Sequence, residues 1–311
     1  MSAMRTLVRR DLWEHRAITL VPIAFGALFV LVNLLAALGV VKVQIDAGEM
    51  DLTGLFSSLD VQKAGALVQL GLAMVAISLN TVMMFVTVFY LLDCLYAERK
   101  DRSILFWKSL PVSDTRIVGS KLLTATVAVP AVTLAVFVAV SVCMYVITGL
   151  TVQFAGSSHV LGSGPAALVE VTLAHAYALA VQTLWYLPIF GWLLLVSAWS
   201  RRAVLLWAVL PPVAINVIER LVFGTRHFAE LLRERLIGIY PLAFTDDPAR
   251  QQLIWQYEDQ HANVDLQFSE GLLRLLDPGK LLADPGLWAG IIVAALFFAA
   301  AVWMRRYRDD S

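Results

Sequence analysis

Residues 65–92 read GALVQLGLAMVAISLNTVMMFVTVFYLL, a run of 28 residues without a charged side chain. A transmembrane helix needs about 20 mostly apolar residues to cross the hydrocarbon core of a bilayer. This run is long enough, and a charged stretch beginning at Asp93 follows it directly. The alternation of a long apolar run with a charged loop indicates a chain that crosses a membrane repeatedly.

The composition of the whole 311-residue chain agrees with this interpretation. Apolar residues make up 59% of the chain and charged residues 15%, and the mean hydropathy is +0.74. Soluble domains contain about a quarter of charged residues. The 24 basic residues balance the 24 acidic ones, so no excess of positive charge is available for a nucleic acid. These values exclude a single soluble domain, a disordered chain and a nucleic-acid-binding protein.

We therefore expect an all-α integral membrane protein, a single transmembrane domain over residues 1–311, with six transmembrane helices. Pro211 and Pro212 predict a kink or break in the fifth, because proline donates no backbone hydrogen bond. The apolar residues before the fourth predict a lead-in helix over residues 166–176. The expected spans are 17–41, 65–92, 122–149, 177–198, 203–218 and 287–304.

The basic residues predict the orientation, because cytoplasmic loops of membrane proteins carry an excess of Lys and Arg. Fifteen lie beside the chain termini and in the loops after spans two and four, against only Lys42 and Lys63 in the short loops of the other side. Both termini are therefore expected in the cytoplasm. Residues 1–16 are expected to form a basic, amphipathic helix at the inner interface. Residues 225–285 are expected to form an external cap that opens with an amphipathic helix.

Sequence motifs for catalysis are missing. The chain has no phosphate-binding G-x-x-x-x-G-K-[ST] and no zinc-protease H-E-x-x-H motif, and its five histidines are not paired at the spacing of metal ligands. We predict no catalytic residue, no metal site and no cofactor bound by this chain. Asp93 and Glu170 are the ionisable groups nearest to the interior of a span, and they would carry an ion pathway if there is one. Glu219 and Arg220, at the outer end of span five, are expected to pair with each other.

The loop between spans two and three carries the most informative pattern. Residues 93–113 read DCLYAERKDRSILFWKSLPVS, in which the apolar residues 104–107 interrupt a charged stretch. Apolar side chains in such a loop are expected to pack on the protein, to enter the membrane interface or to contact a partner protein. The plainest alternative is an ordinary basic loop held at the membrane surface by anionic lipids.

This loop resembles that of the type-2 permeases of ATP-binding-cassette (ABC) exporters, in which E-R-[KE]-x-G-[ST] is followed by L-P-V-[ST] and a basic residue. Here the matching residues are Glu98–Asp101, Ser109–Ser113 and Lys121. The segment Asp101–Ser103 departs from the pattern, because many members have a small residue or glycine there. The six spans and the large loop between spans five and six are also similar to that family.

The resemblance implies a cytoplasmic coupling helix in this loop, which contacts a separate ATPase subunit. By matching position, a polar clamp would be formed by Glu98, Arg99, Lys100 and Arg102. The contact ridge would be formed by Ile104, Leu105, Phe106, Trp107 and Lys108, and the return turn by Leu110 and Pro111. The implied complex has two copies of the ABC ATPase, which would bind ATP and Mg²⁺, and a second permease subunit, identical or different. It would lie in the lipid bilayer of a cell membrane, most simply a bacterial inner membrane.

The mechanism implied is export by alternating access, with the substrate path along spans two and five and a possible gate at Pro211 and Pro212. An ion-coupled secondary transporter is the alternative. It predicts inverted repeats, whereas only the second half of this chain has a double proline and a large loop. An integral-membrane enzyme would require clustered ionisable residues at one depth, which we do not find in the sequence, and a membrane scaffold without transport activity remains a further alternative.

Overall fold

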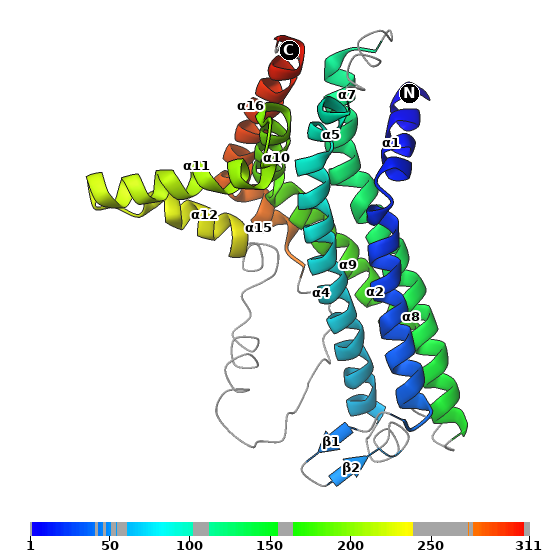
Figure 1. The fold of residues 1–311 in the computed structure, drawn as a ribbon. Coiled ribbons are helices and arrows are strands. Elements are labelled where there is room, and N and C mark those ends of the chain that lie inside the picture. The colour runs from blue at the N-terminus through cyan, green and yellow to red at the C-terminus, as the bar shows by residue number, and fades with distance from the viewer. Residues whose placement is uncertain are drawn as a thin grey trace.

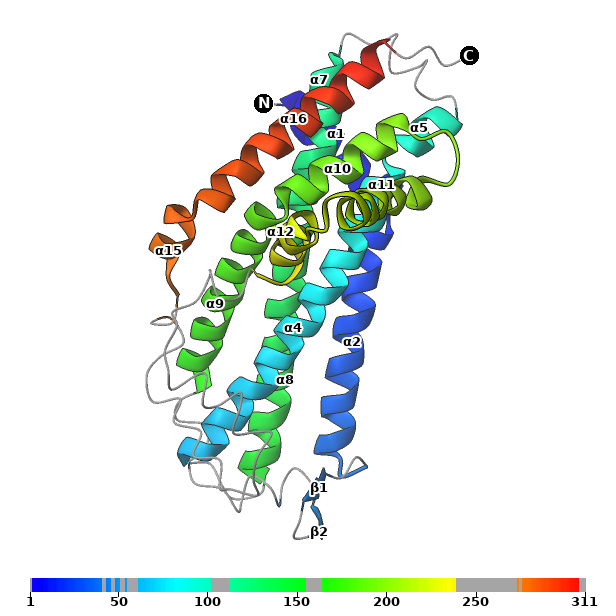
Figure 2. The ribbon, with the colours of Figure 1, turned by 90° about the vertical axis from the view of Figure 1, so that its left-hand side faces the viewer.

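The computed structural model describes residues 2–40, 43–45, 48–50, 54, 61–101, 112–154, 164–238, 273 and 276–307. These residues form an elongated helical bundle with one short antiparallel strand pair, in which Val43 faces Met50. The helix α1 and the C-terminal end of α16 lie at the same end of the bundle, and the strands lie at the other end (Figures 1 and 2). The described elements, in chain order, are α1 (Ser2–Glu14), α2 (Ala17–Ala37), β1 (Val43–Ile45), β2 (Gly48–Met50), α4 (Val61–Asp93), α5 (Tyr96–Lys100), α7 (Asp114–Leu123), η1 (Thr124–Ala128), α8 (Val129–Phe154), α9 (Gly164–Trp185), α10 (Leu187–Trp199), α11 (Val204–Ile218), η3 (Glu219–Phe223), α12 (His227–Ile237), α15 (Pro278–Ala283) and α16 (Pro285–Tyr307).

Among the described residues, five helices are long and apolar enough to cross a membrane, or six if one bent helix pair counts as a span. The helical character of the predicted fold is confirmed. The second, third and sixth predicted spans lie within helices of this kind, the first overlaps α2, which ends at Ala37, and the fifth overlaps the helix Val204–Phe223. The third is longer than expected, because it forms one helix over Asp114–Gln153. A π-helical segment, η1, lies within it just before Pro130. Such segments accommodate a backbone group that lacks its usual hydrogen-bond partner.

The fourth predicted span is a bent pair of helices. The helices α9 and α10 meet at an angle of 55° around Tyr186, and Pro188 lies in the first turn of α10. Proline is tolerated in a first turn but ends the helix that precedes it. The lead-in helix expected over residues 166–176 is the first part of α9.

The predicted break at Pro211 and Pro212 is wrong, because α11 continues through both prolines. Pro212 cannot donate to the carbonyl of Ala208, four residues earlier in the helix. The indole Nε1 of Trp192 in α10 donates to that carbonyl at 3.0 Å. A neighbouring helix thus supplies the hydrogen bond that the proline removes, which is how prolines are accommodated within membrane helices.

The bundle is packed where small residues allow close approach between helices. A β-carbon added at Gly191 in α10 would lie 3.1 Å from the carbonyl oxygen of Ala294 in α16, and one added at Gly26 in α2 would lie 2.7 Å from Val140 Cγ2 in α8. Small residues at such crossings are typical of membrane helices. By contrast, α11 and α12 project to one side of the bundle (Figure 1), and of α11 only Ala208 is buried.

Candidate functional site

The predicted coupling residues divide into two groups. Glu98, Arg99 and Lys100 lie in α5, at the same end of the bundle as α1, α7 and the end of α16 (Figure 1). The other predicted positions lie outside the described residues, so their place in a coupling helix remains a prediction. They are Arg102, Ile104, Leu105, Phe106, Trp107, Lys108, Leu110 and Pro111.

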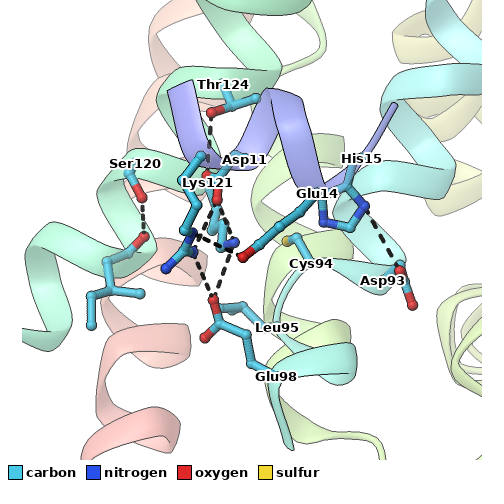
Figure 3. Close-up of polar contacts among 12 residues, drawn as sticks. Asp11, Glu14, His15, Asp93, Cys94, Leu95, Glu98, Ser120, Lys121 and Thr124 are labelled. Atoms are coloured by element: carbon cyan, nitrogen blue, oxygen red, sulfur yellow. Dashed lines mark hydrogen bonds and ion pairs between the residues drawn. The ribbon is translucent and has the colours of Figure 1, made fainter. Parts of the chain in front are cut away.

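Glu98 does not face outward but is buried among three cations, of which Figure 3 labels Lys121. Its Oε1 atom lies 3.1 Å from Lys121 Nζ and 3.2 Å from Arg10 Nη2, and its Oε2 atom accepts a hydrogen bond of 2.7 Å from Arg305 Nη1. One carboxylate therefore joins α5 to α1, α7 and α16. The residue predicted to clamp the coupling helix connects four helices instead.

A second carboxylate, Asp11 of α1, lies at the centre of the same region. Its Oδ1 atom is 2.7 Å from Lys121 Nζ, and both side chains are fully buried. The hydroxyls of Tyr90 and Thr124 donate to its Oδ2 atom at 3.2 and 3.4 Å. Asp11 belongs to none of the motifs found in the sequence. Its signal was an acidic residue one helical turn after Leu7, on the apolar side of the expected amphipathic helix.

The last helix joins the region through a second contact. Arg305 Nε donates to Asp114 Oδ1 at 3.2 Å, at the first turn of α7. We call the six ionisable residues of this region the ion cluster, and they are Arg10, Asp11, Glu98, Asp114, Lys121 and Arg305. Among these six residues three cations face three anions, and Arg10 also pairs with the half-exposed Glu14. Buried charges are tolerated when they are paired and hydrogen-bonded in this way.

Arg99 also points inward. Its Nη2 atom donates to the carbonyl oxygens of Ser197 and Ser200 at 2.6 and 2.7 Å. These carbonyls end α10, and a cation there compensates the negative end of the helix. The Ser197 hydroxyl in turn accepts from the backbone N–H groups of Leu95 and Tyr96. Only Lys100, of the three described coupling residues, is exposed to solvent.

A groove of about 850 Å³ opens beside the ion cluster, between α2, α4 and the first turn of α11. Its walls are mainly apolar, and its polar residues come from the segment Glu14–Arg16 and from Asp93 and Tyr96. His15 stands edge-on to the ring of Tyr90, with ring centres 4.9 Å apart. Burial lowers the pKa of His15 below its usual value of 6.5, and the nearby Lys121 ammonium lowers it further.

The other ionisable candidates are not brought together. Asp93 Oδ2 lies 3.9 Å from His15 Nδ1, whereas Glu170 accepts a hydrogen bond from the backbone of Leu273. The expected pairing of Glu219 with Arg220 is not observed. The Glu219 carboxylate instead accepts hydrogen bonds from the Thr225 hydroxyl and from the first two N–H groups of α12. Within the described part of the chain, no group of three or more His, Cys, Asp or Glu side chains is arranged to hold a metal ion.

Comparison with known protein families gives a match to part of the chain. Residues 64–201 match the family model described as "ABC-2 family transporter protein". Neither the curated proteins nor the solved structures contain a match to this chain. The matched segment begins in α4 and ends just after α10, so it includes Glu98, Asp114 and Lys121 of the ion cluster. A bundle of apolar helices long enough to span a membrane accompanies the match. The chain is therefore a multi-pass membrane protein, and its residues 64–201 are similar to the ABC-2 type family of ABC transporter permeases.

Proposed function

We propose that this chain is the membrane subunit of an ABC exporter, which moves its substrate by alternating access while separate subunits hydrolyse ATP. Two ATPase copies, each holding ATP and Mg²⁺, and two permease subunits make up the complex. The chain lies in a cell membrane, a bacterial inner membrane in the simplest case, with both termini and the loop between α5 and α7 in the cytoplasm. This chain itself carries out no catalysis, in keeping with the non-catalytic role normal for its family.

The observation that carries this proposal is the position of the ion cluster around the coupling loop. The described residues stop at Asp101 before this loop and resume at Val112 after it. Glu98 lies just before that interval, and Asp114 and Lys121 lie just after it. A force applied to the loop by an ATPase is therefore applied to residues that are ion-paired to α1 and α16. Such a contact changes the bundle only if it differs between the two states of the ATPase.

The substrate path is proposed along α4 and α11, the second and fifth predicted spans. The groove between α2, α4 and α11 supports this position, since it presents an open, mainly apolar surface beside both helices. Pro211 and Pro212 remain the proposed gate, although α11 is not broken there. Its support is the exposure of α11, of whose residues only Ala208 is buried in the described structure.

The experiment that tests the proposal is co-purification of the tagged chain with its ATPase from mild detergent. A variant with Phe106→Ala and Trp107→Ala removes the apolar ridge of the predicted coupling helix. The matched control replaces two exposed aromatic residues at the same end of the bundle, Trp303→Ala and Tyr307→Ala. We expect a P-loop ATPase with the intact chain and the control, and a loss of both the ATPase and its hydrolysis activity with the ridge variant.

Failure of the intact chain to bind any nucleotide-hydrolysing subunit would overturn the proposal. In that case an ion-coupled transporter is the next hypothesis, and transport should then depend on Asp93 and Glu170. In the described structure these two residues have separate partners and do not form a relay.

A further inference from the structure

The groove beside the ion cluster is polar at one end and mainly apolar along the rest of its length. Its polar end is formed by Glu14, His15, Arg16 and Asp93, next to the start of α2 and the end of α4. Its other lining residues on α4 are apolar and extend back to Val82. Eleven residues separate Val82 from Asp93, which corresponds to about 16 Å of helix at about 1.5 Å per residue. In the proposed orientation, the polar end lies at the cytoplasmic headgroup level and the apolar part enters the bilayer.

The polar end offers one anion and one cation that have no ionic partner among the described residues at neutral pH. Asp93 is 55% exposed, and the ionisable side chain beside it is His15, at 3.9 Å (Figure 3). Because burial lowers the pKa of His15, this imidazole is neutral at pH 7 and does not neutralise Asp93. Arg16 is exposed, and no described carboxylate lies in ion-pair distance of it. Glu14 differs, since it pairs with Arg10 Nε at 3.3 Å.

The apolar wall presents large side chains that are exposed in the described structure. Phe85 and Phe89 are each 61% exposed, and they lie one helical turn apart on the same face of α4. Val82 precedes Phe85 by three residues and continues that face. Val21 of α2 and Leu205 of α11 complete the walls, and both are also exposed. The groove thus has an apolar channel beside one positive and one negative charge.

We propose that this groove binds a glycerophospholipid of the inner leaflet whose headgroup carries a primary amine beside its phosphate, as in phosphatidylethanolamine. The amine lies against the Asp93 carboxylate, the phosphate against the Arg16 guanidinium, and an acyl chain against Phe85 and Phe89. A molecule with this charge order complements both free charges, whereas a purely anionic lipid leaves Asp93 opposed by like charge. The inference rests on the proposed function, because it names the substrate class for the path proposed there.

Lipid binding to the purified, delipidated full chain is the test, by native mass spectrometry in a non-ionic detergent. The probes are phosphatidylethanolamine, phosphatidylglycerol and diacylglycerol with identical acyl chains. We expect phosphatidylethanolamine to bind most tightly. Asp93→Asn should weaken its binding about threefold to fivefold, the range of an ion pair that remains partly exposed, and should remove its advantage over phosphatidylglycerol. The matched control Glu230→Gln removes an exposed carboxylate of α12 and should change neither lipid.

A second pair of variants tests the apolar channel. Phe85→Ala with Phe89→Ala should weaken all three lipids about tenfold, since each loses the same acyl contact. Ile292→Ala with Leu296→Ala removes similarly exposed apolar side chains from α16 and should leave binding unchanged. All four positions are exposed, so the melting temperature of each variant should stay near that of the unaltered chain.

Equal binding of the three lipids, or an unchanged preference in Asp93→Asn, would overturn the inference. An ATPase that co-purifies with a chain showing no lipid preference would leave the proposed function standing and reject only the lipid. Selective lipid binding without any ATPase would support the groove as a lipid site and reject the transporter.

Discussion

Removal of one charge from the ion cluster should destabilise the protein more than removal of a nearby exposed charge. Asp11 and Lys121 are both fully buried and their charged atoms lie 2.7 Å apart. Removing one partner of a buried ion pair leaves the other charge uncompensated, which costs about 3–5 kcal/mol. Asp11→Asn leaves Lys121 a second carboxylate, Glu98, at 3.1 Å, so we place its effect near the lower end, at about 3 kcal/mol.

The double variant gives the sharper result. Asp11→Asn alone leaves three cations facing two anions, and Lys121→Met alone leaves the reverse, whereas the double variant leaves two of each. Its loss of stability should therefore be smaller than the sum of the two single losses, by about 1–3 kcal/mol. With about 2 °C of melting temperature per kcal/mol for a chain of this length, each single variant should melt about 6–10 °C below the unaltered protein.

The assay is thermal unfolding of the detergent-purified chain followed by tryptophan fluorescence, with one scan rate for all variants. Arg306→Gln is the control, because Arg306 neighbours Arg305 in sequence but is exposed. Single variants that melt within about 2 °C of the control, with a double variant equal to their sum, would refute the burial and the coupling inferred for the cluster.

Three further perturbations test other contacts. Trp192→Phe removes the donor to the Ala208 carbonyl, which Pro212 leaves free, and should lower the free energy of unfolding by about 1–3 kcal/mol. The loss should be clearly smaller in a Pro212→Ala background, where the helix supplies its own N–H. An equal loss in both backgrounds would contradict that role of Trp192. Gly290→Ala places a β-carbon against the Arg235 guanidinium and should lower the melting temperature, whereas in an Arg235→Ala background it should have little effect. Additive losses would contradict that clash. Because the pKa of His15 is lower in the folded chain, the unfolded chain binds more protons as the pH falls below about 6.5, and stability should fall as the pH drops from there through the folded pKa. His15→Gln should flatten this dependence of stability on pH. Parallel pH profiles of the variant and the unaltered chain would contradict the lowered pKa.

Much of the helical framework could be predicted from the sequence, because one strong physical constraint determines the secondary structure of long apolar runs. In the bilayer core each backbone polar group must be satisfied internally, so an apolar run of sufficient length becomes a helix wherever it lies in the chain. Residues 65–92 fall entirely within α4 for this reason. The amphipathic helix expected at the start of the external cap is found as α12, again from a periodic pattern within one segment.

The effect of the prolines could not be predicted in the same way, because it depends on which neighbour meets the free carbonyl. Pro212 lies within an unbroken helix since Trp192, from another helix, donates to the group that the proline leaves unpaired. At Tyr186 the chain bends instead, just before Pro188. No local pattern separates these two cases, since the deciding contact comes from a residue about 20 positions away in the chain.

The ion cluster was hidden for a related reason. Arg10, Lys121 and Arg305 belong to the excess of basic residues at one end of the spans, and orientation alone accounts for such an excess. Their carboxylate partners are separated from them by up to 207 positions, so only the folded chain brings them together. The loop motif did identify Glu98, but its similarity to the family did not reveal that its side chain points into the protein.

The inward direction of Glu98 and Arg99 changes which residues are available to a partner in the proposed complex. Both side chains are committed to contacts within the chain, whereas Lys100 is exposed and the predicted ridge follows it. An ATPase would then bind through Lys100 and residues 102–111, and its movement would reach α1 and α16 through the paired charges of Glu98. The two steps separate experimentally, because charge reversal at Lys100 should weaken ATPase binding without lowering the melting temperature. Replacement of Glu98 by Gln should lower the melting temperature, and it should also reduce the ATPase activity that remains bound.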